Sequence, residues 1–192
     1  MPIKVAAAPK NAMKLLETGI KQHLTAGLVD ATLGQVESIA APHRVFHLGL
    51  DALVGEKPIA TAAEHVGWRA QLLGRGKQAL ASAELVITRD GLKFANVSRG
   101  PHAAGSGEGD AAAERWSREE KADHELALLR IPGAYCTALW LRSSDGKREA
   151  YIPIAPCPPN LRPNTVYSES ELRAALLPEA RKQLDGPRDG GG

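Results

Sequence analysis

Apolar and polar residues alternate most regularly on both sides of a Ser-Asp-Gly-Lys turn in the C-terminal half of the chain. Folding the chain back at this turn places Leu139 opposite Ile152 and Trp140 opposite Tyr151. Aliphatic residues then share one face and the two aromatic residues share the other. We therefore predict an antiparallel hairpin over 125–155.

Two further features indicate how this hairpin sits in a sheet. Arg142 and Glu149 face each other in the same register, and such an opposite-charge pair stabilises it. Pro153 has no backbone N–H, which a strand with neighbours on both sides would need. A four-residue turn directs Pro153 away from the neighbouring strand. We therefore predict that 148–155 is an edge strand.

Residues 61–74 carry two conflicting signals. A Thr-Ala-Ala-Glu run at their start matches a helix capping box. The residues that follow alternate instead, and folding the chain back at its glycines places Trp68 opposite Ala83 with every residue on that side apolar. Because two segments agree on one register, we predict a second hairpin, 66–73 with 78–88. A helix over 61–74 remains the alternative.

Three segments are predicted as helices. Apolar residues recur every three or four positions over 11–26. A glycine-rich loop over 96–110 ends on an aspartate that can cap a helix through 111–121. Ser168 begins the capping box of the last helix, which Pro178 is expected to break.

With a strand at 44–50, these elements indicate an α+β fold: an antiparallel sheet of about five strands, made of two hairpins plus one strand, with three helices packed against it. Strands do not alternate with crossover helices, which argues against a parallel sheet. A length of 192 residues fits one domain. We expect a single domain over 1–184 and a flexible, glycine-rich tail over 185–192.

Composition and charge argue against several classes of protein. The chain has 24 basic and 22 acidic residues, so its net charge of +2 gives no strong attraction to nucleic acid or to an anionic membrane. No stretch approaches the roughly 20 apolar residues of a membrane helix. The first residues lack the apolar core of a secretory signal. We therefore expect a cytoplasmic protein that binds neither nucleic acid nor membrane.

Cys136 is the candidate nucleophile, with His124 nearby in sequence. A thiolate–imidazole pair needs both groups within hydrogen-bond distance. A straight strand would separate them by roughly 40 Å, so only a sharp bend at Pro132 and Gly133 would bring them together. A small buried cysteine is the commoner case. We expect Cys136 and Cys157 to be free thiols.

The remaining residues give no pattern for a catalytic or metal site. HExxH and CxxC motifs and clustered carboxylates are absent from the sequence. We therefore predict no catalytic residue, no metal and no cofactor.

One face of the second hairpin suggests a role in recognition. Opposite its aliphatic face it carries Ala138, Trp140 and Tyr151, flanked by Arg142 and Glu149. Tryptophan, tyrosine and arginine are enriched at interface hot spots. A helix of the same chain that packs on Trp140 is the commoner explanation for such a face.

The function expected from this surface is a non-catalytic interaction module, an adaptor, immunity-type or assembly protein that binds a protein partner or itself through 125–155. The alternative is a cysteine-dependent hydrolase or transferase that uses Cys136. A weaker alternative is a small-ligand carrier with its pocket between sheet and helices.

Overall fold

The computed structural model describes residues 3–25, 33–120, 123–143 and 148–185. Its strands are β1 (Lys4–Val5), β2 (Ser38–Ile39), β3 (His43–His47), β4 (Glu64–Leu73), β5 (Ala79–Thr88), β6 (Gly91–Ser98), β7 (His124–Ile131), β8 (Cys136–Ser143) and β9 (Ala150–Pro153). Its α-helices are α1 (Ala12–Thr25), α2 (Leu50–Val54), α3 (Ile59–Ala62), α4 (Pro101–Glu120) and α5 (Glu169–Asp185). Short 3-10 turns are η1 (Leu33–Gln35), η2 (Arg75–Lys77) and η3 (Pro132–Ala134).

The strands form one sheet in the order β6-β5-β4-β3-β7-β8-β9, with β1 beside β7 and β2 beside β4. The α+β class is confirmed. The prediction of a purely antiparallel sheet is wrong, because β7 pairs in parallel with both β1 and β3. The described ranges contain nine strands and five α-helices instead of about five strands and three helices. The middle of strand β7, residues 126–129, is apolar on both faces, as is typical of a central strand beside parallel neighbours.

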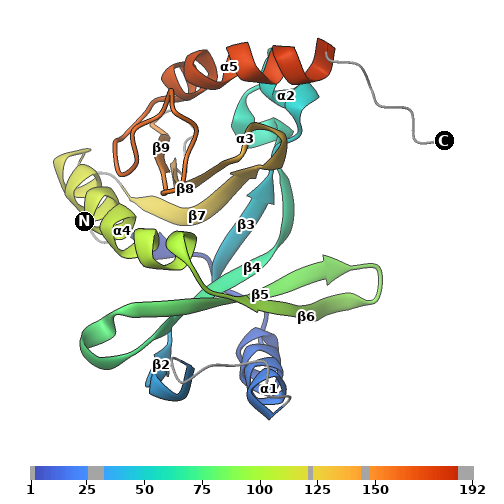
Figure 1. The fold of residues 1–192 in the computed structure, drawn as a ribbon, viewed down its shortest axis with the longest axis vertical. Helices are drawn as coiled ribbons and strands as arrows, with labels where there is room; N and C mark the ends of the chain where they lie inside the picture. Colours follow the sequence, from blue (N-terminus) through green and yellow to red (C-terminus); the bar gives the residue numbers. More distant parts are fainter. Residues whose placement is uncertain (1–2, 26–32, 121–122, 144–147, 186–192) are drawn as a thin grey trace.

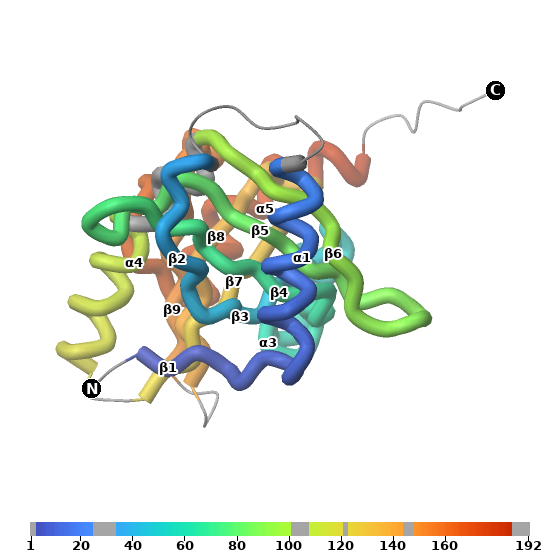
Figure 2. The backbone as a smooth tube through the Cα atoms, turned by 90° about the horizontal axis from the view of Figure 1, so that it is seen from below, coloured from blue at the N-terminus to red at the C-terminus, as the bar shows by residue number. Residues whose placement is uncertain are grey.

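Helices cover both faces of the sheet (Figure 1). The stripe of α1 that contains Leu16 packs on Trp68, Ala70 and Leu72 of β4, so the predicted helix over 11–26 is confirmed. Gln71 points to the opposite face, where its amide donates to an α4 carboxylate at 3.0 Å. Figure 2 shows α1 lying beside β5 and β6. On the same face of the sheet as α1, helices α2, α3 and α5 cover strands β7 to β9.

The second hairpin keeps its predicted register but not its predicted length. Leu139 pairs with Ile152 and Trp140 with Tyr151, and β9 is an edge strand of the sheet. The segment 125–142 is not one strand, because η3 turns the chain back so that β7 and β8 pair with each other. A proline followed by a glycine starts this turn. The predicted Ser-Asp-Gly-Lys turn lies outside the described residues.

The first hairpin has the predicted faces in a different register. Trp68 pairs with Leu85 rather than with Ala83, a shift of two residues that keeps most of the predicted apolar face. The exception is Val66, which packs with Val45 and Leu128 on the other face, where the ladder with β3 is irregular. The shift arises in the turn, where Gly76 has a φ of 68° and the ladder is irregular beside Leu73. The alternative of a helix over 61–74 is wrong. Thr61 lies in the short helix α3, which ends before β4 begins.

Three other elements differ from the prediction. Strand β6 was not predicted, and α4 begins at Pro101, inside the segment expected to be a loop. The predicted strand over 44–50 is shorter, because β3 ends at His47. The proline of α5, Pro178, does not break the helix: it removes one backbone bond, while buried Ala180 in the next turn keeps that turn packed on the core.

Two expectations concern the ends of the chain and the membrane. Of the tail predicted over 185–192, only Asp185 is described, and it is the last residue of α5. Within the described ranges, no helix is long and apolar enough to cross a membrane.

Candidate binding cleft

The residues predicted to form an interaction surface lie together, but their aromatic part is buried inside the chain. Trp140, Tyr151 and Ala138 are each 0% exposed. The rings of Trp140 and Tyr151 stack with centroids 5.7 Å apart. Leu172 and Leu176 of α5 belong to the same core cluster. A helix of the same chain therefore covers this face, so these three side chains offer no exposed surface to a partner.

Glu149 holds the polar tips of the two rings. The indole Nε1 of Trp140 donates to Glu149 Oε2 at 3.1 Å, and the Tyr151 hydroxyl donates to the same oxygen at 3.0 Å. Burial raises the pKa of the Glu149 carboxyl, while these two hydrogen bonds act in the opposite direction. Because buried indole and phenol groups need such partners, Glu149 completes the packing of the pair.

Arg142 does not make the ion pair expected from the sequence. Its guanidinium lies 4.7 Å from the ring centroids of both Phe46 and Trp140, a cation–π arrangement. Its closest acidic partner is Glu125, at 3.6 Å from Nη1. Arg142 therefore packs on the aromatic cluster and also contacts β7 through Glu125.

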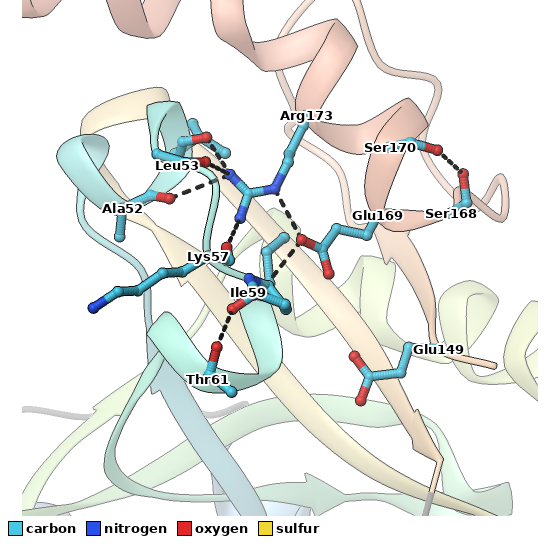
Figure 3. Close-up of polar contacts among 12 residues, drawn as sticks. Ala52, Leu53, Lys57, Ile59, Thr61, Glu149, Ser168, Glu169, Ser170 and Arg173 are labelled. Carbon is cyan, nitrogen blue, oxygen red and sulfur yellow. Dashed lines mark hydrogen bonds and ion pairs between the residues drawn. The ribbon is translucent and has the colours of Figure 1, made fainter. Parts of the chain in front are cut away.

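A polar network fixes α5 over this cluster (Figure 3). The guanidinium of Arg173 donates to backbone carbonyls at the end of α2, among them Ala52 at 3.2 Å and Gly55 at 2.9 Å. Its Nε donates to Glu169 Oε1 at 2.9 Å, and the same oxygen accepts the backbone N–H of Ile59 at 3.0 Å. One side chain therefore joins the first turns of α5 to the α2–α3 connection.

A cavity of about 920 Å³ lies between the sheet, η3 and α5. Its lining comes from segments far apart in sequence: Arg69, Ser82, Glu84, Ser98, Arg99, Arg130, Pro132, Ala134, Tyr135, Cys136, Thr137, Pro156, Cys157, Pro158, Pro159, Asn160, Ala175, Leu176 and Glu179. We refer to it as the cleft. A volume of this size is within the range of small-molecule sites.

One wall of the cleft is charged although it is largely buried. Arg130 donates from Nη1 to Glu84 Oε2 at 2.9 Å and from Nη2 to the other carboxylate oxygen. The guanidinium of Arg69 also approaches Glu84, with 3.9 Å between Nε and Oε1. Arg69 is 2% exposed, and burial lowers its pKa. Two guanidinium groups thus lie against one carboxylate.

Two neutral polar groups accompany these charges. Burial, together with the charges of Arg69 and Arg130, lowers the pKa of His43 to about 3. The hydroxyl of Ser82, a cleft residue that is 1% exposed, has no hydrogen-bond partner among the described residues. The wall therefore has a positive potential and an available hydroxyl.

The opposite wall is apolar and includes both cysteines. Burial, followed by the neighbouring Cys157, raises the pKa of Cys136 to about 12. Both thiols are free. The bend at η3 does not bring His124 to Cys136, because they lie at opposite ends of the β7–β8 ladder, roughly 23 Å apart along an extended strand. His124 instead contacts the carbonyl of Arg148 at 2.9 Å.

Sequence reasoning did not identify the cleft. The prediction placed Arg69, Ser82 and Glu84 on the polar side of the first hairpin. Its register, with Trp68 opposite Ala83, did not pair Arg69 with Glu84 as the structure does. In the sequence, an arginine between Trp68 and Ala70 within a predicted strand was the available signal. In the part of the chain that the structure describes, no group of three metal-ligating side chains comes together. Comparison of the chain with known protein families, curated proteins and solved structures gave no match.

Proposed function

We propose that this protein is a non-catalytic binding protein that holds a small organic molecule in the cleft. The observation that carries the proposal is a cavity of about 920 Å³ with one apolar wall and a few polar groups on the other. Ligand sites in proteins have this composition, since apolar walls give affinity and a few polar groups fix orientation. The proposal takes up the carrier expected as a weaker alternative from the sequence.

The chemistry of Cys136 supports binding over catalysis. A nucleophilic cysteine acts as a thiolate, which requires a lowered pKa and partial exposure. Cys136 is 2% exposed, and its raised pKa keeps the thiol protonated at neutral pH. The cysteine-dependent alternative therefore has no activating group to support it among the residues described around this thiol.

Filling the cleft should weaken binding. Octanol, octanoate and octylamine are each titrated into the protein by calorimetry, and at least one should bind with a Kd of about 1 mM or lower. Ala175 lines the cleft from α5, so Ala175→Trp should weaken binding at least tenfold. Ala174→Trp is the matched control, because Ala174 is exposed on the same helix and lies outside the cleft lining. If none of the probes binds, or if both variants bind equally, the proposal is wrong.

A second candidate function is protein interaction, now at the mouth of the cleft. Tyr135 is 80% exposed, so its aromatic ring is open to solvent. Its φ is 49°, in the left-handed region that disfavours large side chains. Exposed tyrosine is typical of interface hot spots. A second copy of this chain is the partner that purified protein can test directly.

Tyr135→Gly separates this role from folding. Glycine adopts the left-handed conformation without the cost of about 1–2 kcal/mol that other residues incur. The variant should therefore be at least as stable as the wild type in denaturant titrations. If Tyr135 joins two copies, light scattering should detect a wild-type dimer and a monomeric variant. A wild type that is monomeric at all concentrations contradicts self-association.

A further inference from the structure

The balance of charges in the cleft favours an anion. Its described lining includes three arginines, Arg69, Arg99 and Arg130, and two glutamates, Glu84 and Glu179. The glutamate of α5, Glu179, is exposed at the opposite wall, whereas Glu84 lies between Arg69 and Arg130. An anion beside Arg130 would thus meet a wall in which positive groups outnumber negative ones.

Two donors of this wall lie near Glu84: Arg130 contacts its carboxylate, and Ser82 precedes it by two residues on β5. The side chain of Arg130 is 29% exposed and lines the cleft. The hydroxyl of Ser82 is buried, lines the same cleft and has no partner within the described residues. A buried hydroxyl left without a partner costs free energy, which a ligand oxygen would recover.

The bonds within the wall also bear on which anion would fit. Arg130 holds the carboxylate of Glu84 through one N–H of each terminal nitrogen. A guanidinium has five N–H donors, so the remaining ones can donate to the oxygens of a second carboxylate. Apolar residues of the cleft follow Arg130 in the chain at Pro132 and Ala134, and Leu176 of α5 adds to them.

We propose that the ligand is an amphipathic carboxylate, with its head group at Arg130 and Ser82 and its aliphatic part along the apolar wall. This assignment rests on the proposed function, since it names the class of molecule that the cleft holds. Other groups on α4's side of the sheet leave the assignment unchanged. His43 is neutral, and the Asp110 carboxylate, which accepts from the Gln71 amide at 3.0 Å, lies outside the cleft lining.

The head group is tested with three probes of the same chain length. At pH 7 octanoate is an anion, octanol is neutral and octylamine is a cation. Wild-type protein should bind octanoate at least tenfold more tightly than octanol, and octylamine most weakly. Equal binding of all three overturns the carboxylate assignment and leaves the binding function standing. Binding of none overturns both.

Variants locate the head group. Arg130→Gln should reduce the preference for octanoate over octanol at least tenfold while octanol binding stays the same, and Ser82→Ala should reduce it severalfold. Arg89→Gln makes the same change in net charge at an exposed residue outside the cleft, so it should leave the preference unchanged. An equal loss in Arg130→Gln and Arg89→Gln would mean that only the net charge matters. If Arg130→Gln does not fold, Ser82→Ala and the wild-type series decide the question.

Discussion

Replacing Trp140 by alanine should lower the free energy of unfolding by about 3–5 kcal/mol. The side chain is 0% exposed and stacks on Tyr151, so its removal leaves a cavity beneath α5. The change also leaves the carboxylate of Glu149 without its indole donor. Chemical denaturation followed by circular dichroism measures the effect on the purified chain.

A conservative variant serves as the control for this loss. Trp140→Phe keeps most of the ring packing and removes the hydrogen bond to Glu149, so it should cost less than Trp140→Ala, about 1–3 kcal/mol. A loss below about 1 kcal/mol for Trp140→Ala would contradict a core position. That result would support the interaction surface at Trp140 that the sequence pattern indicated.

Acid should destabilise the fold through His43. Its pKa is about 3 in the folded chain against 6.5 for the unperturbed group, because it is buried beside Arg69 and Arg130. Between these two values the unfolded state binds a proton that the folded state does not. This contribution to stability is therefore present above pH 6.5 and is lost as the pH falls towards 3, by up to about 1.4 kcal/mol per pH unit.

The test compares wild type with His43→Gln between pH 7 and pH 5. The variant lacks the titrating group, so its free energy of unfolding should fall less steeply with acid. Lowered pKa values of His47 and His65 act in the same direction, but they are present in both proteins and cancel in the comparison. His23→Gln, on α1, controls for loss of a histidine. Parallel pH profiles for wild type and His43→Gln would contradict the assignment.

The accuracy of the sequence prediction depended on how local each pairing is. Leu139 and Ile152 were paired correctly because a short turn and Pro153 together restrict the register. The first hairpin kept its faces from Trp68 onwards, since a shift of two residues preserves the side of a side chain, but Gly76 and an irregular ladder moved its register. Strand β6 has a similar alternation, with Leu92 and Phe94 packing towards α1, and could have been recognised.

The charged wall of the cleft could not be predicted in the same way. Arg130 meets Glu84 only because β7 takes a place beside β3, near the middle of the sheet. That place depends on parallel pairing between segments with a long stretch of chain between them, for which no short sequence pattern exists. Similarly, the covering of Trp140 depends on Arg173, which joins α5 to α2 through backbone carbonyls that any sequence would offer.

The insertion of β7 beside β3 has a consequence for the order in which the chain can fold. During synthesis Val45 emerges long before Leu128, its neighbour in the parallel ladder, so β3 has a bare edge until most of the chain has been made. Closing such a long loop is entropically costly, and folds rich in distant contacts form slowly. A fragment that ends before β7 would therefore expose the edge of β3 and be prone to aggregate.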